Sequence, residues 1–184
     1  MATREKILFE AGKLFSQRGY FAVSMEDIAQ SVGVTKATLY HHFRSKEDIC
    51  RELVSSACEE LKKRIQVRLH KDKNPINALF GVVLTMLDVA LERPEILLMN
   101  SLEMVSDDRT PVVQYMVNLR TEILRFLRDV LVKLDVTQKR TSRYAFELAE
   151  FLIGLVFSPI TQQRQESKIT AKRIVRFLFP EQSS

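Results

Sequence analysis

Apolar residues recur at helical spacing along nearly the whole chain, and this spacing predicts an all-α protein. The N-terminal segment is a clear case, because Ile7, Ala11 and Leu14 share one side of a helix predicted over residues 3–18, which Gly19 ends. Only 5 Gly and 5 Pro among 184 residues also favour long helices over sheets and turns. Further helices are predicted over residues 46–70, 75–92, 111–134, 138–157 and 170–179, with a short one over 95–105.

Between the first two long helices, residues 24–48 carry the signals of two short helices joined by a tight turn. Ser24 and Asp27 form a capping box, in which the hydroxyl accepts a hydrogen bond from a first-turn amide and the carboxylate accepts one from the amide of the capping residue. Gly33 then allows the left-handed conformation that ends a helix, and Thr35 caps a second helix that begins at the next residue. Because the connection is so short, the two helices are expected to cross steeply, as in a helix-turn-helix.

The second short helix has two different sides. Leu39 and Phe43 fall on one side and are expected in the core, whereas the other side is small, polar and aromatic. Such a side suits the wall of a DNA major groove, although a lone tyrosine or histidine pair is more often half-buried or solvated. Ser45 and Asp48 form a further capping box, so Lys46 and the neighbouring amides are expected at the positive end of the next helix, where a phosphate binds well.

The stretch GYFAVSMEDIAQSVGVTKATLYHHFRSKEDI, residues 19–49, resembles the N-terminal DNA-binding region of TetR-type transcriptional regulators. Beyond roughly the first third of the chain, the resemblance extends only to length and helical character. It implies a three-helix helix-turn-helix DNA-binding domain at residues 1–46 and a larger helical domain at 47–184 for effector binding and dimerisation. Arg4, at the N-terminal end of the first helix, is a further candidate for a backbone or minor-groove contact. By position, the resemblance implies base-edge contacts from Lys36, Ala37, Thr38, Tyr40 and His41, and phosphate contacts from Ser24, Thr35, His42 and Lys46.

The resemblance also implies an assembly and a function. The two long helices at 111–134 and 138–157 would pair with their copies in a four-helix homodimer interface, although their spacing alone fits an internal hairpin equally well. The expected function is a ligand-responsive transcriptional repressor that binds a palindromic operator in double-stranded DNA and is released by a small effector. The alternative is a helical ligand-binding or scaffolding protein without specific DNA recognition. Neither an enzyme nor a cofactor is expected, because the sequence shows no nucleophile with a paired base and no glycine-rich phosphate loop.

Met and Phe residues at helical spacing in the middle of the chain are typical of a core, and as a set they also fit the lining of an apolar cavity. The polar residues Asp88, Asn100, Glu103 and Tyr115 interrupt this set, so the effector is expected to be lipophilic with one or two polar anchors. The residues expected to line the cavity are Phe80, Met86, Leu87, Met99, Glu103, Met104, Tyr115, Met116, Leu119, Phe126 and Phe151.

A net charge of +5 suits an anionic partner without identifying one. The basic residues between Lys62 and Lys73 follow one another near the end of a predicted helix and are interpreted as favourable charge at its C-terminus. Cys50 and Cys58 are about 12 Å apart along the same helix, too far for a disulfide, and no metal site is expected. Since no signal peptide is visible and no apolar run approaches the ~20 residues that span a bilayer, a cytoplasmic protein is expected.

Overall fold

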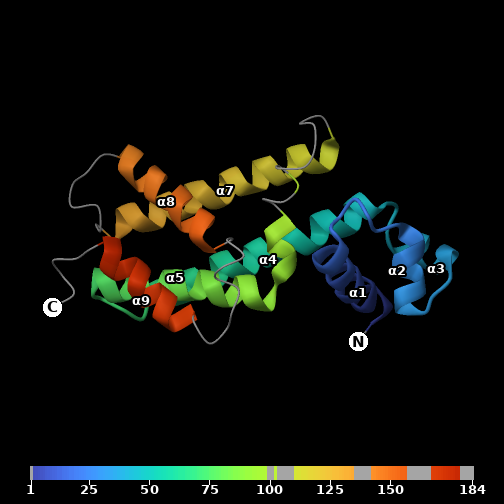
Figure 1. The fold of residues 1–184 in the computed structure, drawn as a ribbon, viewed down its shortest axis with the longest axis horizontal. Coiled ribbons are helices and arrows are strands. Elements are labelled where there is room, and N and C mark those ends of the chain that lie inside the picture. Colours follow the sequence, from blue (N-terminus) through green and yellow to red (C-terminus); the bar gives the residue numbers. More distant parts are fainter. Residues whose placement is uncertain (1, 99–101, 103–109, 135–141, 157–166, 179–184) are drawn as a thin grey trace. The chain divides into compact units, whose positions relative to one another are not determined.

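The computed structural model describes residues 2–98, 102, 110–134, 142–156 and 167–178. Within these residues every regular element is a helix, which confirms the predicted all-α class (Figure 1). The elements are α1 (Thr3–Arg18), α2 (Met25–Val32), α3 (Lys36–His42), α4 (Lys46–Leu69), α5 (Pro75–Glu92), the 3-10 helix η1 (Pro94–Leu97), α7 (Pro111–Lys133), α8 (Ser142–Val156) and α9 (Ser167–Leu178).

Most helices begin where the sequence carries a cap or a proline. The Asn74 side chain accepts hydrogen bonds from two first-turn amides of α5, at 2.9 and 3.1 Å, and Pro75 in that turn has no amide to satisfy. The helix predicted over 95–105 begins instead as the 3-10 turn η1, and most of its remaining residues lie outside the described part. The predicted start of the 138–157 helix also lies outside it, and α9 begins at Ser167 rather than at residue 170.

The chain divides into two compact units, of which the first combines Met1–Ala57 with Pro94–Leu119. In this unit α1 packs against α2 and η1, and α2 packs against α3. The division between a DNA-binding domain ending at residue 46 and an effector-binding domain beginning at residue 47 remains a prediction. The helices are held by an apolar core in which Ile7, Phe15, Ile28, Leu39 and Ile49 are at most 1% exposed.

The second unit combines Cys58–Arg93 with Arg120–Ser184, and α5 is its central helix. By length and composition alone, α5 is long and apolar enough to cross a membrane. This corrects the expectation that no apolar segment of the chain approaches the length needed to span a bilayer. A core helix passes the same test, and most of α5 is buried while it packs against α8 and α9. The apolar character of α5 is therefore explained by packing inside this unit.

Cys50 and Cys58 are both buried at 0% exposure, as their interpretation as small buried apolar residues requires. Burial raises the pKa of each thiol to about 12, because the charged thiolate loses its hydration. Both cysteines are therefore neutral packing residues at physiological pH. Across the described residues, no group of three or more His, Cys, Asp or Glu is placed to hold a metal ion.

Candidate nucleic-acid interface

The helix-turn-helix begins with the capping box predicted at the start of α2. The Ser24 hydroxyl accepts a hydrogen bond from the Asp27 amide at 3.1 Å, and the Asp27 carboxylate accepts one from the Ser24 amide at 2.8 Å. The hydrogen bonds from Ser24 hold the pKa of Asp27 below its usual value. The carboxylate therefore stays charged at the positive end of α2, and the first residue of that helix is fixed.

The turn between α2 and α3 depends on one left-handed residue. Gly33 has φ 76° and ψ 35°, and its amide donates to the carbonyl of Ala29 at 3.0 Å. L-residues with a side chain rarely adopt this positive φ and would be strained in it, which is why a glycine suits the position. Thr35 then accepts a hydrogen bond from the Thr38 amide at 3.1 Å and so caps α3 as predicted. The sequence prediction of a tight helix-turn-helix is confirmed.

The two sides of α3 differ as the sequence predicts. Leu39 is fully buried and Phe43, which follows the last residue of the helix, is 3% exposed. Tyr40, which lies between the buried side and the opposite one, is 49% exposed, a large fraction for an aromatic side chain. The remaining candidate base-edge and phosphate contacts on this segment are exposed at Lys36, Ala37 and His41 and half-buried at Thr38 and His42.

Lys36 at the start of α3 is held by an acidic residue of α2. Its Nζ lies 2.6 Å from Glu26 Oε2, and this pairing raises the pKa of Lys36. Both side chains are more than half exposed, so the ion pair contributes little to stability. Lys36 can therefore exchange Glu26 for an anionic or base-edge partner at small cost.

Lys46 has a structural role that its sequence position did not reveal. Its Nζ donates hydrogen bonds to the backbone carbonyls of Tyr20 at 2.8 Å and Val23 at 2.7 Å, and lies 4.3 Å from the centre of the Tyr20 ring. Burial lowers the pKa of Lys46, although the amine keeps two carbonyl partners. The lysine thus ties the first turn of α4 to the loop between α1 and α2. A phosphate contact from the same amine remains a prediction.

Replacing Lys46 with methionine is expected to lower the free energy of unfolding by about 1–3 kcal/mol, because two carbonyls lose a charged hydrogen-bond donor. Urea denaturation of the full chain measures the change. Lys36→Met is the matched control and is expected to leave the urea midpoint close to that of wild type, since it removes an exposed ion pair. Unchanged stability of Lys46→Met, together with a salt slope for DNA binding reduced by about one, would instead favour a phosphate contact alone.

Two arginines near the helix-turn-helix behave differently. Arg4, considered from the sequence as a DNA contact, forms a two-point ion pair with Glu52 of α4 and lies 4.6 Å from the centre of the Phe43 ring. The Glu52 hydrogen bond raises the pKa of Arg4. Arg44 was not singled out from the sequence, yet it is exposed between α3 and α4 and has no ion pair within the part of the chain that the structure describes. Its position directly after Phe43, at the end of α3, is the signal that would have identified it.

The residues expected to line an effector cavity are only partly described. Met99, Glu103 and Met104 lie outside the described residues. Met86 is 2% exposed and packed in the core, whereas Phe151 is 43% exposed. A common cavity for the set remains a prediction. Of the described members, Tyr115, Met116 and Leu119 belong to the first unit, and Phe80, Met86, Leu87, Phe126 and Phe151 to the second.

A family model matches the N-terminal part of the chain. Residues 7–53 match the model of a family described as bacterial regulatory proteins, tetR family. The biofilm operon icaADBC HTH-type negative transcriptional regulator IcaR of Staphylococcus aureus is 38% identical over 77 residues, which are 42% of this chain and 41% of IcaR. The match thus spans about two fifths of the length of this curated relative.

Solved structures share the fold along nearly the whole chain. The fatty acid degradation regulator FadR from Bacillus halodurans superimposes with a TM-score of 0.81 at 16% identity, covering 100% of this chain and 97% of FadR. AibR in complex with isovaleryl coenzyme A and operator DNA gives a TM-score of 0.75 at 20% identity, covering 97% of this chain and 99% of AibR. At these identities the likeness shows a shared fold, with an N-terminal helix-turn-helix followed by a helical C-terminal part.

Proposed function

The chain carries an N-terminal DNA-binding domain of the TetR family of bacterial regulatory proteins, and on this basis we propose that it is a ligand-responsive transcriptional repressor. It binds a palindromic operator as a homodimer and leaves it when a small effector binds. The family and the relatives named above are transcriptional regulators and not enzymes, in line with the expectation from the sequence. Repression, rather than activation, is supported by the name of IcaR as a negative regulator.

The observation that carries this proposal is the outward side of α3. Leu39 anchors the helix in the core, while Tyr40 and Lys36 stand on its exposed side. Recognition helices have this arrangement: one side packs against the core of the domain, and the exposed side contacts base edges in the major groove through small, polar and aromatic groups. We assign base contacts to Lys36, Ala37, Thr38, Tyr40 and His41, and phosphate contacts to Ser24, Thr35, His42, Arg44 and Lys46.

Two copies of α3 in a dimer would enter major grooves about 34 Å apart, one turn of the duplex. The two-fold symmetry of such a dimer requires two half-sites in inverted orientation, and hence a palindrome. We propose that α7 and α8 form the dimer contacts, with residues 1–46 as the DNA-binding domain and 47–184 as the effector-binding and dimerisation domain.

The effector is proposed to be a small lipophilic molecule that occupies the apolar C-terminal part of the chain. The presence of isovaleryl coenzyme A in the AibR structure and the naming of FadR as a fatty acid degradation regulator support an acyl-type effector. Release from DNA requires the effector to bind the DNA-incompetent state more tightly than the competent one. We propose α4 as the coupling element, because its first half belongs to the first unit and its second half to the other.

The second candidate function is a helical ligand-binding or scaffolding protein whose helix-turn-helix serves only in packing. The helix caps and buried core residues of α2 and α3 fit either function, because any packed helix needs them. The exposure of Tyr40 favours DNA recognition, since a packing tyrosine would be covered.

Selection of bound fragments from a random double-stranded DNA pool, with the full chain at fixed salt concentration, tests the proposal. The expected result is an enriched palindrome with half-site centres about 10 base pairs apart. A variant carrying Lys36→Ala and Tyr40→Ala is the control and is expected to enrich no motif. A pool without enrichment from folded wild-type protein would overturn the proposal and favour the scaffolding alternative.

A further inference from the structure

A charged groove lies in the second unit, between the last turns of α4 and the middle of α5. Its volume is about 750 Å³, which is within the range of small-molecule sites. Basic side chains line it along α4 and just beyond the end of that helix, while α5 contributes Thr85 and Asp88. The basic lining residues are Lys63, Arg64, Arg68 and Lys71.

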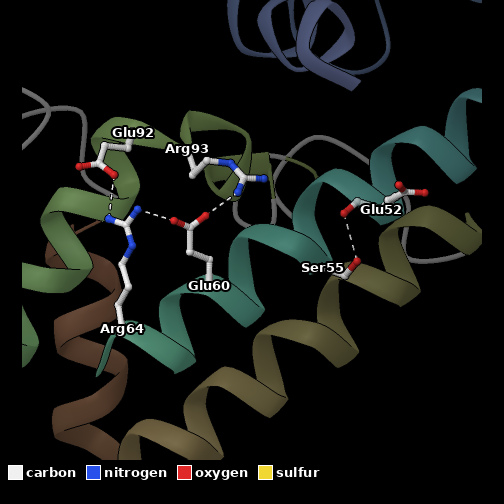
Figure 2. Close-up of polar contacts among 6 residues, drawn as sticks. All are labelled: Glu52, Ser55, Glu60, Arg64, Glu92 and Arg93. Atoms are coloured by element: carbon white, nitrogen blue, oxygen red, sulfur yellow. Dashed lines mark hydrogen bonds and ion pairs between the residues drawn. The ribbon is translucent and has the colours of Figure 1, made fainter. Parts of the chain in front are cut away.

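Glu60, one of the carboxylates that line the groove, is already paired with two cations. Glu60 accepts hydrogen bonds from Arg64 and, at 2.7 Å, from Arg93, and Arg64 also reaches Glu92 at 2.7 Å (Figure 2). Burial raises the pKa of Glu60, but the hydrogen bonds from Arg93 and Arg64 outweigh it and leave the pKa below its usual value. Glu60 therefore remains charged and committed to these arginines.

The other two carboxylates of the lining also have interactions within the molecule. Glu59 lies 2.8 Å from Lys62, which does not line the groove. Asp88 is not free either. By contrast, Lys63, Arg68 and Lys71 are exposed and form no ion pair with any residue that the structure describes. The groove consequently has an excess of positive charge.

The Arg68 side chain is placed by a glycine of α5. A Cβ atom added to Gly81 would lie 2.8 Å from Arg68 Cγ and 2.9 Å from Arg68 Nε, closer than such atoms approach in proteins. The arginine stem therefore lies against the α5 backbone at the one point where no side chain blocks it. This contact places the Arg68 side chain along the groove that it lines.

Favourable charge at the C-terminus of α4 does not account for this arrangement. The field of a helix end falls off within the last turn, which in α4 includes Arg68. Lys63 lies six residues before Leu69, the last residue of α4, or about 9 Å along the axis. The position of Lys63 and the Gly81 contact instead fit a site formed by residues of both helices.

We propose that this groove binds a small molecule carrying a diphosphate group. Three unpaired cations balance the charge of a diphosphate, and the planar guanidinium of Arg68 matches two phosphate oxygens at once. The remaining volume accommodates the organic part of the ligand beside Val67 and Thr85. The site goes beyond the proposed repressor function and does not require DNA binding.

Isothermal titration calorimetry of the full chain with pyrophosphate, ADP and coenzyme A tests this site. Saturable binding of any of the three is expected, and Arg68→Gln should weaken it about tenfold or more. Equal affinity for all three supports recognition of the diphosphate alone. Tighter binding of ADP or coenzyme A supports further contacts to the organic part. Absence of binding of all three at millimolar concentration would overturn the proposal.

Two variants separate a built site from general charge attraction. Gly81→Ala keeps every charge but displaces Arg68, and is expected to weaken binding several-fold, with folding checked by circular dichroism. Lys73→Gln removes one exposed cation that does not line the groove, and should change affinity less than about twofold. An equal loss in Lys73→Gln and Arg68→Gln would overturn the site. So would loss of non-operator DNA affinity in Arg68→Gln without any change in diphosphate binding.

Discussion

Tyr40→Ala is expected to weaken operator binding about tenfold or more while leaving the stability of the protein unchanged. The Tyr40 side chain is 49% exposed on the outward side of α3, so its removal opens no cavity in the core. In the proposed complex it would contact the groove, where a base-reading contact is worth about 1–3 kcal/mol and each 1.4 kcal/mol is about a factor of ten. Binding isotherms on the selected operator at fixed salt measure the loss.

The control for this variant is Phe9→Ala on α1. Phe9 is 60% exposed, so a similar area of aromatic surface is removed away from the recognition helix, and operator affinity should stay within about twofold of wild type. Tyr40→Phe separates the hydroxyl group from the ring. An operator isotherm for Tyr40→Ala that coincides with the wild-type isotherm would remove α3 from the interface.

Leu39→Ala, one residue earlier on the same helix, is expected to destabilise the protein by about 2–5 kcal/mol. Leu39 is 0% exposed, and its truncation leaves a cavity where α3 meets the core of the first unit. Denaturant titration followed by circular dichroism measures the change. DNA binding should be lost in proportion to the unfolded fraction, because α3 is positioned only by the helices behind it.

Leu39→Met is the matched variant for Leu39→Ala. It conserves side-chain volume, and its cost is expected to be below about 1.5 kcal/mol. If Leu39→Ala were as stable as Tyr40→Ala, the assignment of inward and outward sides of α3 would be wrong. Substitutions at two adjacent residues of one short helix are thus predicted to have different effects. Tyr40→Ala lowers operator affinity, and Leu39→Ala lowers the stability of the protein.

The boundaries of the helix-turn-helix were predictable because the interactions that set them are local. The Ser24–Asp27 and Thr35–Thr38 hydrogen bonds join residues three positions apart, and Gly33 needs only its own backbone angles. Apolar spacing within α3 likewise placed Leu39 in the core. The overall helical class followed from the same repeated spacing.

Residue roles that depend on distant partners were not predictable. Lys46 reads as a phosphate ligand at a helix start, yet its partners are carbonyls 26 and 23 residues earlier. From the sequence, the basic residues at the end of α4 are interpreted as favourable charge at a helix C-terminus. The structure adds the contact of the Arg68 side chain with Gly81 of α5. The local sequence around Lys46 and Arg68 does not predict either of these contacts.

The sequence by itself determined where the N-terminal helices begin and end and which side of the recognition helix is buried, since caps and apolar spacing act within about one helical turn. The tertiary structure alone decided which charged side chains are engaged and which are available to a ligand. Glu60 is paired with Arg93, 33 residues later in the chain, whereas Arg68 in the same groove has no ion pair with any described residue. The physical reason is that an ion pair depends on the distance between two charges in space, which packing sets and sequence separation does not.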